Sequence, residues 1–203
     1  MKKEKTMGAK TSKSSRSCSP PKAAKKESKA GAGARVKLVT KPSEIVKKGE
    51  NWVLMFPRFG DDRGTHRHTY GQLTPYFKGL TQGKLMATRC TNPKCPVYHG
   101  NGELWLPPRA DCPDCLAPMV WEEVKGLEGY IYTYTYVERG GAGLEIECPY
   151  YQIDVKIPKV ATIVKSYLIN RDRKIKIGDK VRAKFWTGKD ATNTCLDLYF
   201  ELV

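Results

Sequence analysis

The sequence predicts a mainly β protein in which a zinc ribbon precedes a small barrel of the OB type. Two cysteine pairs lie sixteen residues apart, and five strand-like segments without a helical pattern follow them. The first 41 residues contain almost no large apolar side chains. We therefore expect four parts: a disordered basic tail (1–41), an N-terminal extension with a helical arm (42–83), the zinc ribbon (84–122) and the OB-fold barrel (123–203).

The basic tail holds most of the formal net charge of +15. Residues 1–41 contain 13 of the 36 Lys and Arg residues but only 2 of the 21 Asp and Glu residues. Lys, Ser, Ala and Gly cannot bury enough surface to offset the entropy of ordering, so we expect disorder. A flexible polycation attracts nucleic acid without sequence preference, and we expect such binding only through the tail.

Targeting signals are not evident in the chain. No apolar core follows the first lysines, and no stretch approaches the apolar length of a membrane span. We expect a cytoplasmic protein that does not bind membranes and keeps its seven cysteines reduced.

The N-terminal extension contains one short apolar run, Trp52–Phe56, before Pro57. The run is either a lone strand or a segment that docks on a partner. His66 and His68 follow in a polar, turn-prone stretch, where a solvated loop is the simpler interpretation than a metal site.

A helix with clear end signals leads into the ribbon. Thr74 is suited to the N-cap, Pro75 to the first helical position, and Gly83 to the end of the helix. Tyr76, Phe77 and Leu80 share one side at helical spacing.

The ribbon is predicted by Cys90-x4-Cys95 and Cys112-x2-Cys115. Both pairs lie in turns rich in Pro, Asn and Asp, so four thiolates can meet at one structural zinc and leave no position open for water. Two disulfides or unrelated thiols are the alternatives. The first pair has a longer spacing than usual, and His99 could replace Cys95 as a ligand.

The remaining cysteines, Cys18, Cys148 and Cys195, show no sign of activation. No histidine follows Cys148, which argues against its use as a nucleophile.

The barrel strands are expected at 129–137, 151–155, 160–169, 180–186 and 195–202. In the first of them Tyr130, Tyr132, Tyr134 and Tyr136 alternate with apolar and Thr residues, so this tyrosine row is predicted to share one face. It could stack nucleotide bases or pack against the ribbon or a partner.

A second face of the barrel alternates basic and apolar residues from Lys174 to Phe185. Its basic side could bind phosphates of nucleic acid or of coenzyme A, or be the ordinary solvated side of an edge strand.

These motifs together resemble the family of zinc-ribbon and OB-fold proteins that accompany thiolases and related acyl-CoA enzymes. The matching segments run from Thr74 to Val203: Pro75–Leu80, Gly83–Leu85, Cys90, Pro107–Cys115, Trp121, Gly129 and Lys176–Val181. The longer first knuckle, an insertion at 96–106 and the first 70 residues depart from the family pattern. The N-terminal segment is similar to the zinc-finger subunit of benzoylsuccinyl-CoA thiolase in anaerobic toluene degradation.

The resemblance implies a rubredoxin-like ribbon, one zinc per chain and a non-catalytic subunit in a hetero-oligomer with a thiolase, with two copies of each. The thiolase would supply the nucleophile for acyl-CoA thiolysis, in the most specific form from benzoylsuccinyl-CoA to benzoyl-CoA and succinyl-CoA. Coenzyme A would bind near the junction, where we expect Arg109 and Arg89 to contribute. The alternative is an autonomous OB-fold nucleic-acid-binding protein, which would need the tyrosine row exposed.

Overall fold

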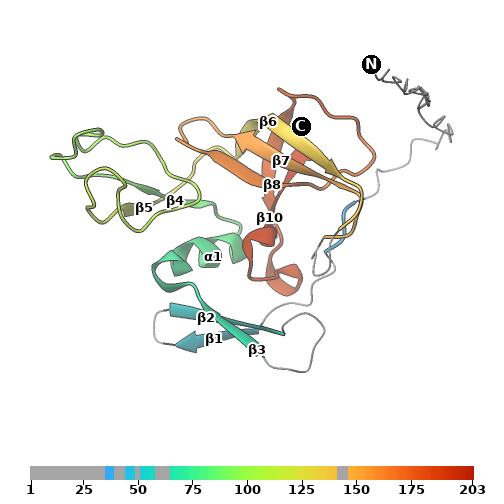
Figure 1. Cartoon of the computed structure of the whole chain (residues 1–203), viewed down its shortest axis with the longest axis horizontal. Helices are drawn as coiled ribbons and strands as arrows, with labels where there is room; N and C mark the ends of the chain where they lie inside the picture. The colour runs from blue at the N-terminus through green and yellow to red at the C-terminus, as the bar shows by residue number, and fades with distance from the viewer. Residues whose placement is uncertain (1–34, 39–43, 49–50, 58–64, 141–145) are drawn as a thin grey trace, which may run out of the picture. The chain divides into compact units, whose positions relative to one another are not determined.

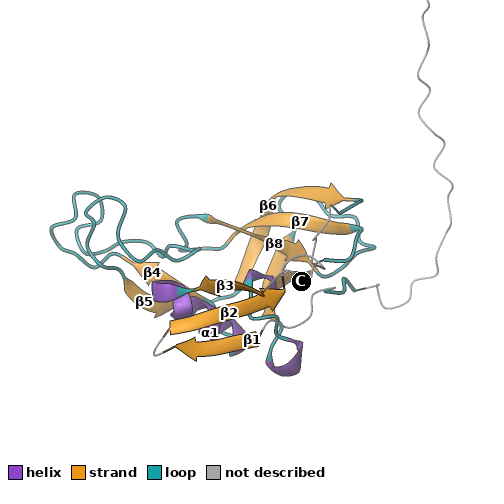
Figure 2. Cartoon of the chain, turned by 60° about the horizontal axis from the view of Figure 1, so that its bottom comes forward, coloured by secondary structure: helices purple, strands orange, loops and turns teal. Residues whose placement is uncertain are grey.

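A computed structural model describes residues 35–38, 44–48, 51–57, 65–140 and 146–203. Most of the predicted disordered tail lies outside these ranges. The described chain is mainly β, with ten strands, one short α-helix and three 3₁₀ turns (Figures 1 and 2). Among the described residues, no helix is long and apolar enough to cross a membrane.

The barrel contains five strands in the closed order β10-β8-β7-β6-β9. They are β6 (Glu128–Val137), β7 (Tyr150–Lys156), β8 (Ile163–Leu168), β9 (Lys180–Phe185) and β10 (Leu198–Leu202). β10 runs parallel to β8, and the other four pairings are antiparallel. This strand order confirms the predicted OB-like barrel.

β6 carries a bulge that the alternation did not predict. Ile131 pairs with Val155 and Thr133 with Asp154, so Tyr132 has no partner residue on β7. One extra residue reverses which side chains face inward. Tyr134 and Tyr136 therefore share a side with Tyr151, whose ring lies 5.9 and 4.9 Å from theirs. The prediction that the whole tyrosine row shares one face is wrong.

The ribbon is built on two short antiparallel strands, β4 (Met86–Arg89) and β5 (Val120–Glu123). Trp105 adds a bridge to Thr88, with backbone hydrogen bonds of 2.8 and 3.2 Å. The base of the ribbon joins the barrel core, because Leu85, Ala87, Leu104 and Leu106 belong to the same apolar cluster as Ile131 and Phe200.

The helix α1 (Thr74–Thr81) begins one residue earlier than the capping pattern predicted. Thr74 does not cap it, because its hydroxyl donates instead to the carbonyl of Gly71 at 2.7 Å. Gly83 follows the C-cap residue Gln82 with φ +73°, as expected for a helix end. Tyr76 and Leu80 are buried in the barrel core, and Phe77 stacks on Tyr70.

The N-terminal extension forms a three-stranded antiparallel sheet, β1 (Glu44–Lys48), β2 (Asn51–Pro57) and β3 (Thr65–Thr69), in that order. The run at Trp52–Phe56 is therefore a strand, but it is not alone. His66 and His68 lie in β3, where they pair with Phe56 and Leu54, and not in a loop as predicted.

Residues 35–38 lie along the barrel, although composition assigned them to the disordered tail. Arg35 bridges to Asn170 and Leu38 to Ile146. Val36 is 2% exposed and covers a second apolar cluster with Tyr150 and Tyr167. We call these four residues the strap.

Candidate metal centre and its surroundings

The four predicted cysteines come together in the ribbon. The Sγ atoms of Cys90, Cys95, Cys112 and Cys115 all lie within 4.8 Å of one another. The Cys90 and Cys115 sulfurs are 3.7 Å apart, far beyond the roughly 2.05 Å of a disulfide. The edge of a tetrahedron with metal–sulfur bonds of about 2.3 Å is about 3.8 Å, so the group fits a metal ion bound by all four thiolates.

The backbone holds each pair in a tight turn. In the first turn the amide of Cys95 donates to Asn92 O at 3.0 Å. In the second, Leu116 N donates to Cys112 O at 2.9 Å, and Cys112 N to Ala117 O at the same distance. Cys90 directly follows β4, so the strand aims the first ligand at the group.

Burial and hydrogen bonds shift the pKa values of these thiols in opposite directions. Burial raises the pKa of the Cys90 thiol to about 12. The backbone N–H of Ala117, followed by the Asn92 side chain, lowers the pKa of Cys115 to about 7. N–H donors directed at a sulfur stabilise its negative form, which is the form that binds a metal.

His99 lies outside the cysteine group and is exposed. It occupies a turn in which both His99 and Gly100 have positive φ (47° and 81°) and Asn101 N donates to Tyr98 O at 2.8 Å. These are the features of a type I′ turn, in which His99 and Gly100 reverse the direction of the chain.

Arg89 is engaged within the ribbon. Its Nε and Nη2 atoms donate to the two carboxylate oxygens of Glu122 at 2.8 and 2.9 Å, and Nη1 donates to Gly102 O at 2.7 Å. This fork joins β4, β5 and the loop after the first cysteine pair. The sequence did not point to Glu122 as the partner. The pairing leaves Arg89 poorly suited to hold a coenzyme A phosphate.

Arg109 has an exposed side chain beside the cysteine group. Its guanidinium lies 4.8 Å from the ring centre of Trp105, and its backbone N–H donates to the Thr88 hydroxyl at 2.9 Å. Trp105 and Tyr98 pack against the cysteine cluster. Sequence reasoning missed both aromatic residues, because neither lies in a recognisable motif.

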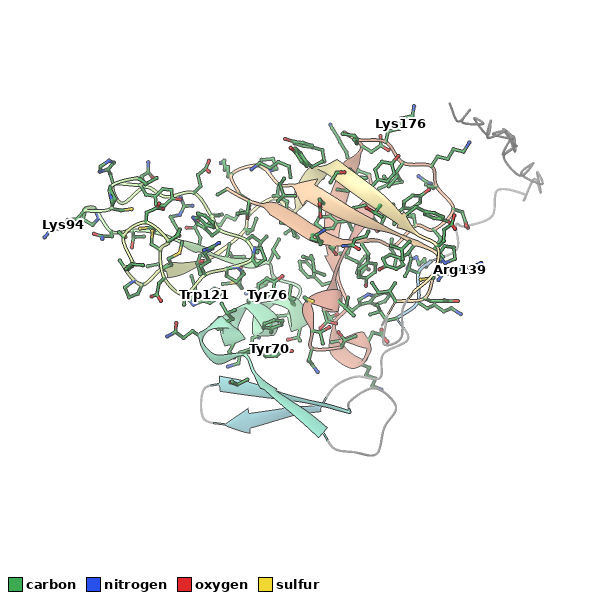
Figure 3. The ribbon with its side chains drawn as sticks, in the orientation of Figure 1. Tyr70, Tyr76, Lys94, Trp121, Arg139 and Lys176 are labelled. Atoms are coloured by element: carbon green, nitrogen blue, oxygen red, sulfur yellow. The ribbon has the colours of Figure 1, made fainter. Side chains whose placement is uncertain are left out.

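A cleft of about 610 Å³ lies between α1 and the ribbon. Pro75 and Lys78 of α1 line one side, and Met119 and Trp121 line the other. Trp121 packs against the core that also holds Tyr76, and both are labelled in Figure 3. The mixed apolar and charged lining is of the kind that binds small organic ligands.

Two of the five cations on the predicted basic face, Arg182 and Lys184, form ion pairs with acidic side chains. Arg182 pairs with Glu128, and Lys184 pairs with Glu201 at 3.2 Å. The pKa of Glu128 is accordingly lowered by its hydrogen bond from Arg182. At these two positions the contacts favour the solvated-strand interpretation over phosphate binding.

The tyrosine row is exposed in the single chain. Its members retain 38–55% of their accessible surface, and Tyr132 at the bulge retains the most. The ribbon therefore does not cover the row, which leaves base stacking or packing against a partner as the open interpretations.

No family model and no curated protein matches this chain. Among solved structures, a DUF35-family protein of unknown function from Sulfolobus solfataricus is 21% identical, with a TM-score of 0.45 over 66% of this chain and 87% of that one. A chain of the Ltp2-ChsH2(DUF35) aldolase is 22% identical, with a TM-score of 0.48 over 63% of this chain and 91% of that one. At these values the similarity carries no argument about function, and the fold class rests on this chain's own strand order.

Proposed function

We propose that this chain is a zinc-binding, non-catalytic accessory subunit of a thiolase that acts on acyl-CoA. The exposed aromatic side chains of β6 are the observation that carries this proposal. Large aromatic residues that stay exposed on a closed barrel are typical of protein interfaces. The motif order from Thr74 to Val203, which resembles the accessory proteins of thiolases, supplies the kind of partner.

The cysteines of this chain support a complex in which this chain binds zinc and the partner supplies the catalytic nucleophile. A thiolase needs an activated cysteine to take up the acyl group. The four ribbon cysteines would all be zinc ligands and so would not be available as nucleophiles. A zinc with four thiolate ligands would stabilise the ribbon and would have no open position for water. The nucleophile would then belong to the partner.

Within the proposed complex, Arg109 is better suited than Arg89 to meet coenzyme A. Arg109 is exposed over Trp105, whereas Arg89 is held by Glu122 and Gly102. The nearby cleft between α1 and the ribbon could receive the ligand. A complex with two copies of each subunit and benzoylsuccinyl-CoA as substrate is the most specific form of the proposal.

The competing function is an autonomous OB-fold nucleic-acid binder. Exposure of the tyrosine row is what that function requires, and the structure meets the requirement. The bulge, however, divides the row, so the four rings do not form one continuous stacking surface along the strand.

Co-expression tests the proposal directly. The chain is tagged, purified with and without thiolases from the same genome, and assayed for cleavage of a 3-oxoacyl-CoA with excess coenzyme A. We expect the thiolase to copurify and to need this chain for activity. Tyr132→Ser should weaken copurification, and Val203→Ser, at another exposed apolar position, should not. Failure to copurify, or full activity of the thiolase alone, would contradict the proposal.

A further inference from the structure

A second hollow lies between the strap and the segment after β9. Its volume is about 440 Å³, and its lining includes Arg35, Lys37, Trp186 and Lys189. Pockets of about 300–1,000 Å³ are of the size that holds small ligands. The sequence motifs discussed above do not include this site.

The charges around the hollow favour an anion. Three cationic side chains, Arg35, Lys37 and Lys189, line it against one carboxylate, Asp190. All three cations are exposed, and none of them forms an ion pair with another residue that the structure describes. Unpaired cations that converge on one hollow are suited to bind phosphate oxygens.

An aromatic ring, Trp186, also lines the hollow and is held in place. The indole N–H donates to the Tyr167 hydroxyl at 2.7 Å, and the Trp186 ring lies 4.9 Å from that of Tyr199. The half-buried indole offers a flat apolar surface beside the cations. A planar heterocycle can stack on such a surface.

Both walls are fixed by hydrogen bonds. Backbone bonds of 3.0 Å join Val36 N to Ile169 O and Glu147 N to Lys37 O, which holds the strap. On the other side the buried Asp197 carboxylate accepts from the Thr192 N–H and hydroxyl at 2.6 and 2.7 Å. A preformed site loses little free energy to ordering when a ligand binds.

We propose that this hollow binds a nucleoside phosphate, with the heterocycle against Trp186 and the phosphates between Arg35, Lys37 and Lys189. The bounded volume suits a single nucleotide, whereas a nucleic-acid strand needs a groove that follows several nucleotides. The shared chemistry allows two sources, a free nucleotide or the nucleotide end of coenzyme A. The proposal that this hollow binds a nucleotide does not depend on the proposed thiolase partnership.

Binding of a fluorescent ADP analogue to the full-length chain, measured by anisotropy, tests the site. At about 150 mM salt the attraction of the basic tail is strongly screened. We expect saturable binding of one ADP per chain, and the Arg35→Ala/Lys189→Ala variant should weaken it at least about tenfold. The matched control, Lys94→Ala/Lys125→Ala, removes the same charge elsewhere on the surface and should change Kd less than about twofold; Lys94 is at the far end of the ribbon (Figure 3).

Competition by other ligands identifies the chemistry. Inorganic pyrophosphate should compete at least about tenfold more weakly than ADP, because it lacks the ring that stacks. Tighter binding of 3′-phosphoadenosine 5′-diphosphate than of ADP would identify coenzyme A as the source, and equal binding would identify a free nucleotide. Equal competition by pyrophosphate, equal loss in both variants, or tighter binding of a deoxythymidine decamer through the same residues would overturn the proposal.

Discussion

The tip of the ribbon and the barrel bury very different side chains. In the ribbon tip (90–103 and 109–119) the buried apolar cluster consists of three cysteines and Met119. The barrel core contains aliphatic and aromatic residues from all five strands, including the fully buried Ile153, Leu168 and Phe200. The hydrophobic effect can therefore hold the barrel, whereas the ribbon tip depends on what its cysteines bind.

Loss of one metal ligand should give the largest loss of stability, and this loss should be confined to the ribbon tip. Binding of zinc is worth about 10–16 kcal/mol in small zinc peptides, so Cys112→Ser should unfold the ribbon tip. We expect amide exchange to become fast in residues 90–103 and 109–119 and to remain slow in β7. Cys195→Ser, at an exposed cysteine outside the group, is the control and should leave both regions protected.

A cavity in the barrel should destabilise the barrel and leave zinc bound in the ribbon tip. Phe200 is fully buried, and Phe200→Ala should lower the free energy of unfolding by about 3–5 kcal/mol. Chemical denaturation followed by circular dichroism measures this loss. If zinc content fell together with barrel stability, the two regions would not be independent in the way that their cores suggest.

Leu80→Ala tests where α1 belongs. Leu80 is fully buried in the barrel core, so we expect a loss of about 2–5 kcal/mol in the unfolding of the barrel. The sequence placed Tyr76 and Leu80 on one side of the helix, and their burial assigns that side to the barrel core. A change confined to the ribbon tip would show that α1 is part of the ribbon.

The Arg89–Glu122 pair should give the smallest effect. The hydrogen bond from Arg89 lowers the pKa of Glu122, so the pair stabilises the fold above the ordinary pKa of glutamate. This stability is lost as pH falls through the lowered pKa. Because Glu122 is 45% exposed, Glu122→Gln should cost at most about 0.5 kcal/mol at neutral pH, measured by urea denaturation. A cost that does not diminish as pH falls through the lowered pKa of Glu122 would argue against an electrostatic origin.

The sequence was sufficient for the strand segments of the barrel and for the cysteine group, because both leave local signals of alternation and spacing. It was insufficient where one residue changes the geometry: nothing in the alternating run 129–137 marks Tyr132 as the bulge. It also missed β1 and β3, whose residues Glu44–Lys48 and Thr65–Thr69 have too few apolar side chains to read as strands. Val36 and Leu38 were hidden by the basic composition around them, and their packing depends on residues more than a hundred positions away.

The central claim is that bound zinc holds the ribbon tip and that apolar packing holds the barrel. Metal analysis of the purified full-length chain tests this claim most directly when it is combined with amide exchange before and after chelation. We predict one zinc per chain, whose removal accelerates exchange in residues 90–103 and 109–119 and leaves β7 and β8 protected. Well under one zinc per chain with the four thiols in disulfides, or equal loss of protection in ribbon and barrel, would contradict this account.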